Sequence, residues 1–211
     1  MILIGQYDSP FVRRVAIAMS FYGITFEHRP WSVFRDTAKL APFNPLTRVP
    51  TLVLDSGETV IESAYILDYL DELAGAENAL IPAAGTARRE ALKVCALACG
   101  LGDKAVSLVY ESLLHKEKSE VWMSRCATQM DAVLDALETD RAQRDGAFWF
   151  GDKIGHADIA VACALQFARE AHPSVFTAPR WPALIAYGDK CEELSQFKSF
   201  AQAFSPPPEN S

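Results

Sequence analysis

Cysteine is scarce in this sequence and is absent from its first eighty residues. The five cysteines are an odd number and fall on segments with a helical pattern, which argues against a disulfide framework and against a zinc cluster. We therefore expect reduced thiols in the core or at the surface, and no metal site. The positions are Cys95, Cys99, Cys126, Cys163 and Cys191.

Basic runs and long apolar runs are also missing. The formal net charge is -7, and without a basic run to follow a phosphate backbone, nucleic acid is not an expected partner. No apolar run approaches the length of a bilayer span, and Met1-Ile2-Leu3 opens on a strand pattern rather than on a signal peptide. These absences predict a cytoplasmic protein that binds small molecules and has no membrane association.

The composition is typical of a globular protein, with 50% hydrophobic and 22% charged residues among 211. Such a chain can bury one or two hydrophobic cores. Residues 1–76 alternate strand and helix patterns, whereas residues 86–205 carry helical patterns alone. Residues 77–85 are predicted to be a linker, and residues 206–211 a flexible tail. The sequence thus predicts an α/β domain followed by an all-helical domain.

The first region has the predicted order β-α-β-α-β-β-α. Strand patterns occupy residues 2–4 and 25–29, helix patterns residues 11–22, 34–40 and 62–73, and a hairpin pattern residues 51–61. In the second region, residues 159–165 are apolar on every side, which predicts a helix at the centre of a bundle. Residues 181–194 and 197–204 are predicted to form the closing helices.

A hydroxyl stands where a dithiol redox site would carry a cysteine. Ser9 precedes Pro10-Phe11-Val12 at the junction of the first strand and the first helix. Backbone N–H groups and the helix dipole stabilise negative charge at such a position, including that of a bound thiolate. Because the sequence is not Cys-Pro-Phe-Cys, this chain can stabilise the sulfur of a ligand but cannot form a disulfide here.

Two other interpretations remain open at this position. Ser-Pro is a favoured N-cap and N1 pair, so Ser9 can be a helix cap and nothing more. The hydroxyl of Tyr7, at the end of the first strand, can also donate to a thiolate, although a side chain in that place more often packs.

Two further motifs offer anchors for a small peptide. Val49-Pro50 stands just before a predicted strand, where a cis bond would leave the N–H and C=O of Val49 free to pair with an extended peptide; an ordinary trans proline is the alternative. Glu62-Ser63 opens the third helix, where it is either a cap or a binding site for a zwitterionic amino-acid end. Together with Ser9, these motifs would hold an amino-acid head, a peptide backbone and a sulfur atom.

Over essentially its whole length, the chain resembles a glutathione S-transferase of the bacterial, serine-type kind. The resemblance rests on the order and spacing of Ser-Pro-Phe-Val-Arg at residues 9–13, Asn-Pro-Leu at residues 44–46, Val49-Pro50, Ile-Glu-Ser at residues 61–63, and residues 151–159. It implies a thioredoxin-like domain that binds glutathione, a helical domain with a hydrophobic co-substrate pocket, and a homodimer.

The resemblance also implies roles for particular residues. Ser9 would activate the thiol of glutathione for attack on a hydrophobic electrophile, as in detoxification, with glutathione as co-substrate and no other cofactor. Glutathione would be bound by Ser9, Phe11, Arg48, Val49, Pro50, Glu62 and Ser63, and Tyr110 would lie in the hydrophobic pocket. Arg48 would reach a carboxylate of the peptide, and Glu62 and Ser63 its γ-glutamyl end.

The sequence departs from the family pattern at two places. Relatives commonly have Ser or Thr three residues before Asp158, where this chain has Gly155, so a weaker helix cap is expected. Many bacterial relatives have Asp-Gly where this chain has Cys99-Gly100. If that carboxylate helps to hold the amino group of glutathione, affinity would be lower here, with Asp103 as a substitute.

Two rival functions are compatible with the same fold. A glutathione-dependent isomerase of a maleyl-type acid would use a similar site, although the Ser-Ser-Cys-type stretch of that group is missing. A non-catalytic binding module would keep the fold and lose the site, and retention of Ser9, Val49-Pro50 and Glu62-Ser63 argues against it. A thiol-disulfide oxidoreductase would require a cysteine at position 9.

Overall fold

The computed structural model describes residues 1–177 and 179–207. Its first part contains a four-stranded sheet with the order β2-β1-β3-β4. Strand β1 (Ile2–Ile4) pairs in parallel with β2 (Glu27–Arg29) and antiparallel with β3 (Thr51–Val53), which pairs antiparallel with β4 (Thr59–Ile61). The predicted order of strands and helices is confirmed, and this part is a thioredoxin-like α/β domain.

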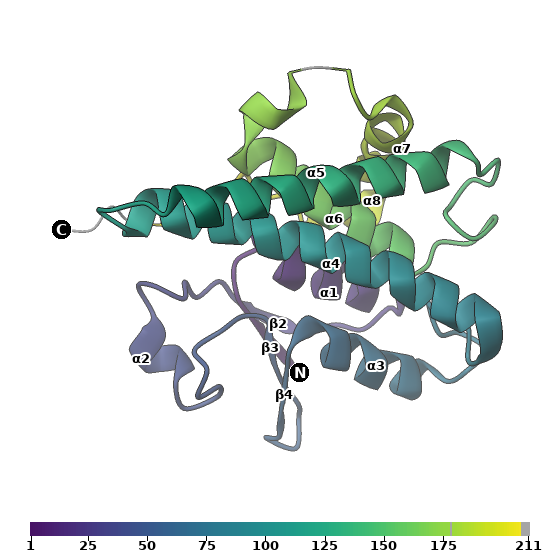
Figure 1. The fold of residues 1–211 in the computed structure, drawn as a ribbon. Coiled ribbons are helices and arrows are strands. Elements are labelled where there is room, and N and C mark those ends of the chain that lie inside the picture. The colour runs from purple at the N-terminus through teal and green to yellow at the C-terminus, as the bar shows by residue number, and fades with distance from the viewer. Residues whose placement is uncertain (178, 208–211) are drawn as a thin grey trace.

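Helix α1 (Pro10–Phe21) lies between the sheet and the helical part of the molecule (Figure 1). It packs on α3 (Ser63–Ala74) and on α4 (Gly85–Leu114) and α6 (His156–Ala171). Nine of its twelve residues are buried, so the first part cannot bury α1 without the helices that follow. The N-terminus of α1, which carries Ser9, is thereby placed at the junction of the two parts.

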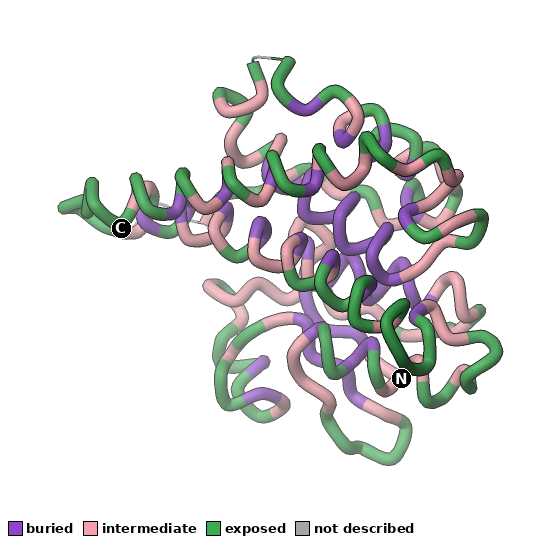
Figure 2. The backbone as a smooth tube through the Cα atoms, turned by 45° about the vertical axis from the view of Figure 1, so that its right-hand side comes forward, coloured by how far each residue is buried: buried purple, intermediate pink, exposed green. Residues whose placement is uncertain are grey.

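The second part is all-helical. Helix α6 packs against α4, α1 and α7, and residues 157–165 are all buried, which confirms its predicted central place; Figure 2 shows buried residues concentrated in the middle of the molecule. Its helices besides α4 and α6 are α5 (Glu120–Ala142), η1 (Pro173–Phe176), α7 (Pro182–Glu192) and α8 (Ser195–Ser199). Among the described residues, no helix is both long and apolar enough to cross a membrane.

The short helix predicted over residues 34–40 begins later, at Thr37 (α2, Thr37–Leu40). The Ser32 hydroxyl accepts hydrogen bonds from the N–H groups of Phe34 and Arg35, and Ser32 N–H donates to Asp36 Oδ2. These local bonds hold the backbone in a turn and delay the helix.

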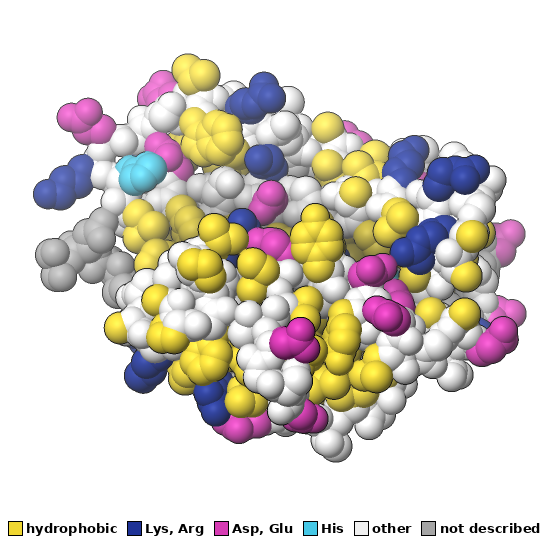
Figure 3. Space-filling view, turned by 90° about the horizontal axis from the view of Figure 1, so that it is seen from below, with side chains coloured by type: hydrophobic (Ala, Val, Ile, Leu, Met, Phe, Trp, Pro, Cys, Tyr) yellow, Lys and Arg dark blue, Asp and Glu magenta, His cyan; other side chains and the backbone are white. Residues whose placement is uncertain are grey.

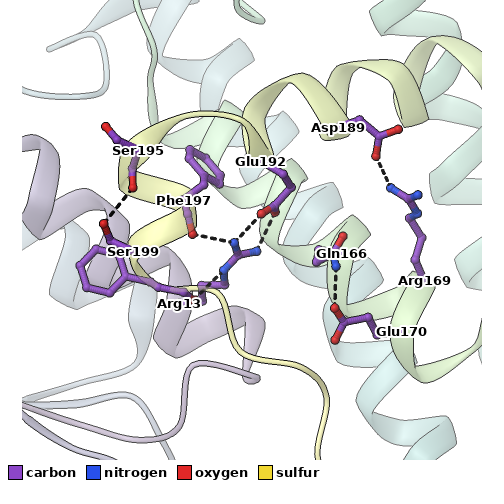
Figure 4. Close-up of polar contacts among 10 residues, drawn as sticks. Arg13, Gln166, Arg169, Glu170, Asp189, Glu192, Ser195, Phe197 and Ser199 are labelled. Atoms are coloured by element: carbon purple, nitrogen blue, oxygen red, sulfur yellow. Dashed lines mark hydrogen bonds and ion pairs between the residues drawn. The ribbon is translucent and has the colours of Figure 1, made fainter.

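The prediction of a helix over residues 197–204 was wrong for the residues after 199, which are not helical. Helix α8 ends at Ser199, and residues 201–207 have no regular secondary structure. Buried Arg13, on α1, donates to the carbonyl oxygens of Phe197 and Phe200 and forms a two-pronged ion pair with Glu192 (Figure 4). The guanidinium thus takes the place of helical N–H donors at this helix end.

A steric restriction explains why Gly155 is the N-cap residue of α6. A β-carbon on Gly155 would lie 2.8 Å from the carbonyl oxygen of Leu80, which accepts a hydrogen bond from His156 N–H. The connection between α3 and α4 therefore runs too close for the Ser or Thr that the family pattern has there. Asp158 still accepts from Gly155 N–H, so half of the usual capping arrangement is kept.

Candidate functional site

A pocket of about 400 Å³ lies between the sheet-containing part and the helical part. Three loops of the first part and the C-terminal half of α4, with Phe167 on α6, form most of its wall. On the face drawn in Figure 3, hydrophobic side chains lie on both sides of a recess in the surface. The lining residues are Gln6, Asp8, Ser9, Pro10, Phe11, Trp31, Ser32, Val33, Phe34, Arg35, Thr47, Arg48, Val49, Asp103, Val106, Val109, Tyr110, Phe167, Phe204, Ser205, Pro206 and Pro207.

Ser9 lies at this pocket and is also the N-cap of α1. Its Oγ accepts a hydrogen bond from Val12 N–H at 3.4 Å, and its backbone is extended. A serine hydroxyl accepts through its lone pairs and donates through a separate proton. The cap therefore leaves that proton available to a ligand, so capping and thiolate stabilisation are compatible roles for one side chain.

Gly5 allows the start of α1 and the loop before β3 to approach each other closely. It belongs to none of the predicted motifs. Its φ of +132° is a conformation that other residues rarely adopt. A β-carbon at this position would lie 2.5 Å from Val12 Cγ2 and 2.8 Å from Val49 Cβ. A glycine directly after the first strand was the available signal, since close approach of two backbones is a common reason for one there.

The loop before β3 brings Arg48 and Val49 to the same pocket. The Val49-Pro50 bond is cis, which is one of the two forms that the sequence left open. Buried Asn44 donates from Nδ2 to the carbonyl oxygen of Arg48 at 2.9 Å and accepts from Leu46 N–H at 3.0 Å. One amide side chain thus fixes both ends of this loop, which explains why Asn-Pro-Leu precedes Val49.

In the Glu62-Ser63 pair, Glu62 is linked to a residue of the pocket wall, Arg48. Neither Glu62 nor Ser63 is among the described residues that line the pocket, but Glu62 Oε1 lies 3.3 Å from Arg48 Nη1. Glu62 makes no capping bond with its side chain, and its φ of +66° is unusual for a residue with a β-carbon. Ser63 is buried at the first position of α3. The structure thus does not support a helix cap as the reason for Glu62.

Tyr7 is oriented differently from Ser9. Its ring stacks on His28, with centroids 3.9 Å apart, and meets Phe200 edge-on. Burial raises the pKa of its phenol to about 12. Tyr7 is not among the described residues that line the pocket, and its contacts are those of a packing residue.

The apolar wall of the pocket joins the two parts. Phe11 lies beside Gly102 of α4, where a β-carbon would touch its ring at 3.4 Å. Tyr110, also on α4, meets Phe34 edge-on with centroids 5.3 Å apart. Burial raises the pKa of the Tyr110 phenol, so this hydroxyl remains protonated and can donate. This part of the wall therefore combines aromatic surface with the Tyr110 hydroxyl as a donor.

Several lining residues had no signal in the sequence. Asp8, the loop of residues 31–35 and the segment of residues 204–207 reach the pocket through the fold and not through a motif. The segment 204–207 falls partly in the tail that was predicted to be flexible; the remainder of that tail, residues 208–211, lies outside the described residues. A proline-rich polar end is normally interpreted as a frayed terminus, which is why its contacts were missed.

Two protein-family models match this chain. The N-terminal domain of glutathione S-transferase matches residues 3–78, and the C-terminal domain of glutathione S-transferase matches residues 120–188. Among curated proteins, the GST-like protein YibF of Escherichia coli strain K12 is 33% identical, over 98% of this chain and 99% of that protein.

Solved structures agree with these matches. A glutathione S-transferase from Methylobacterium radiotolerans, in complex with glutathione sulfonate, has a TM-score of 0.90 and 25% identity over 100% of this chain and 98% of that one. A glutathione transferase family member from Pseudomonas fluorescens Pf-5, with bound glutathione, has a TM-score of 0.81 and 28% identity over 98% of this chain and 99% of that one. This chain belongs to the glutathione S-transferase family.

Proposed function

We propose that this protein binds glutathione in the pocket between its two parts and activates the thiol for attack on a hydrophobic electrophile. The observation that carries the proposal is the position of Ser9, at a helix N-terminus and on a pocket that is also lined by the aromatic side chains of Phe11 and Tyr110. A thiolate held at Ser9 would face Phe11 and Tyr110, where an apolar electrophile would be held. The structures with bound glutathione among the relatives support this assignment.

The energy required is within reach of the groups present. A free thiol has a pKa of about 8.5, so only a few per cent is thiolate at neutral pH. Lowering the pKa by about two units needs about 2.7 kcal/mol of preference for the anion. The Ser9 hydroxyl and the first N–H groups of α1 are the donors proposed to supply it, since hydrogen bonds to a charged acceptor are the stronger ones.

The rest of glutathione is assigned to the neighbouring loops. The backbone of Val49 is proposed to pair with the cysteinyl unit, and Arg48 with a carboxylate. Glu62 and Ser63 are proposed to hold the γ-glutamyl end, with the Glu62 carboxylate facing its amino group. The Arg48–Glu62 pair is exposed enough to open and exchange partners when the ligand arrives.

Calorimetric titration with glutathione and with its S-hexyl derivative tests the proposal. We expect heat with both ligands, tighter binding of the S-hexyl form because of the aromatic wall, and glutathione conjugation of an aryl halide. Absence of binding at millimolar ligand would instead support a binding module that has lost the site. Binding without conjugation, together with isomerisation of a maleyl-type acid, would support the isomerase.

Replacing both Glu62 and Ser63 by alanine is expected to weaken glutathione binding by about 2 kcal/mol, about thirtyfold, because an ion partner and a hydroxyl are lost together. Thermal melting should show that the fold survives. The exposed pair of Arg29 and Glu27 offers a matched control, since Glu27→Ala also breaks an ion pair of the first part. If the double variant and the control have equal affinity for glutathione, Glu62 and Ser63 do not take part in binding it.

We also propose a homodimer. Helices α3 and α4 expose large apolar side chains, with Tyr65 69%, Leu73 53% and Leu92 45% exposed, and such surfaces commonly mark interfaces. Light scattering should give about twice the chain mass, and Tyr65→Glu should shift the protein towards the monomer. A monomer at all micromolar concentrations would contradict this proposal.

A further inference from the structure

The segment after α8 returns to the pocket as an extended strap, defined here as residues 201–207. Three hydrogen bonds join it to other parts of the fold, one from a backbone N–H group and two to carboxylate side chains. Tyr7 N–H donates to Gln202 Oε1 at 2.9 Å, Phe204 N–H donates to Glu170 Oε2 at 2.7 Å, and Ser205 N–H donates to Asp8 Oδ2 at 3.1 Å. The strap is therefore attached to the segment just before α1 and to α6.

The strap forms part of the apolar wall. Phe204 meets Phe167 of α6 edge-on, with centroids 5.5 Å apart, and Phe204 to Pro207 all line the pocket. Any electrophile held near Ser9 and Phe11 would touch this segment. A shift of the strap would change the shape of the electrophile side and leave Arg48, Val49 and Glu62 in place.

Asp8 differs from the other carboxylate that holds the strap, Glu170, in its position relative to the pocket. It directly precedes Ser9, and it lines the pocket itself, whereas Glu170 does not do so among the described residues. Its bond is to the residue next to Pro206 and Pro207, which have no N–H of their own to hold them. Glu170 is held differently, since it also accepts from Gln166 on the same helix (Figure 4).

We propose that Asp8 is a positioning residue that determines the affinity for the electrophile, because it holds the strap against the pocket through Ser205 N–H. The inference rests on the proposed function, since the electrophile is the co-substrate of that reaction. Asp8 takes no part in the chemistry itself. What the bond requires is an acceptor oxygen at this position, which an asparagine amide also supplies.

The test compares Asp8→Ala with Asp8→Asn in conjugation of glutathione to 1-chloro-2,4-dinitrobenzene. Asp8→Ala should raise the KM for the aryl halide about tenfold, the effect of one hydrogen bond to a charged acceptor, and leave the Kd for glutathione unchanged. Asp8→Asn should recover most of the loss. Hydrogen exchange of residues 201–207 should be faster in Asp8→Ala than in Asp8→Asn.

A variant on the other side of the bond separates the strap from the charge of Asp8. Ser205→Pro removes the N–H donor and keeps the carboxylate, and it should reproduce the rise in KM. The double variant Asp8→Ala/Ser205→Pro should be no worse than either single one, because both remove the same bond. If Asp8→Ala does not fold, Ser205→Pro alone carries the test.

The possible failures are distinguishable. If the wild-type protein does not bind glutathione in the calorimeter, the proposed function fails and this inference with it. If the wild type binds and conjugates glutathione, while both variants keep the wild-type KM for the aryl halide, the role of Asp8 is overturned and the proposed function stands. Additive effects in the double variant would also overturn it, because two separate interactions would then have been removed.

Discussion

Replacing Ser9 by alanine is expected to slow conjugation at neutral pH by about 3- to 25-fold, while the affinity for glutathione changes little. The hydroxyl is proposed to donate to the thiolate, and a hydrogen bond to a charged group contributes about 1.5–3 kcal/mol. Its loss should raise the pKa of the bound thiol by about 1–2 units, which is visible in the pH dependence of the thiolate absorbance. Below that pKa, the rate should fall in proportion to the thiolate fraction.

The same substitution should cost about 1 kcal/mol of unfolding free energy, because Ser9 Oγ also caps α1. Ser9→Thr is the matched control, since it keeps both the lone pair and the proton. Tyr7→Phe tests the alternative donor and should leave the thiol pKa unchanged. If instead Tyr7→Phe loses the rate and Ser9→Ala keeps it, the activating role passes to Tyr7. If neither matters, the N–H groups of α1 activate the thiol alone.

The largest loss of stability is expected from Glu192→Ala. Arg13 is 5% exposed, and both of its terminal nitrogens donate to the Glu192 carboxylate, at 2.7 and 2.5 Å. Removing one partner of a buried ion pair leaves an uncompensated charge, which costs about 3–5 kcal/mol. Urea denaturation followed by circular dichroism would measure the loss as a lower unfolding free energy.

A second ion pair on the same helix provides the control for Glu192. Asp189 lies three residues earlier on α7 and pairs with Arg169 at 2.6 Å, but the pair is exposed (Figure 4). Asp189→Ala should therefore cost only about 0–1 kcal/mol. Similar losses in the two variants would show that the carbonyl oxygens of Phe197 and Phe200 suffice for Arg13, and that burial does not set the strength of its bond to Glu192.

Local signals predicted the parts of the fold that local bonding determines. The cap at Ser9 and the hairpin of β3 and β4 depend on residues that are close together in the sequence. The central place of α6 followed from a segment that is apolar on every side. Each of these features is encoded in one short segment of the sequence, so a local pattern was sufficient to predict it.

What the sequence did not predict depends on distant partners. Residues 200–204 have a helical composition, but Arg13 binds the carbonyl oxygens of Phe197 and Phe200 from 184 and 187 residues away along the chain. The strap is similarly attached to Asp8 across 197 residues. Gly155 has the sequence pattern of a weakened cap, but a β-carbon there would lie 2.8 Å from the Leu80 carbonyl oxygen. Contacts of this kind have no periodicity, so pattern analysis cannot detect them.

The pairing of Arg13 with Glu192 has a consequence for synthesis on the ribosome. The two residues are 179 positions apart. At a translation rate of roughly 5–20 residues per second, Glu192 is therefore synthesised about 10–35 s after Arg13. During that interval the nascent first part carries a cation that is buried only in the finished molecule. Helix α1 can therefore dock permanently only after α7 has emerged, and the wall of the pocket that the strap supplies is the last to be completed.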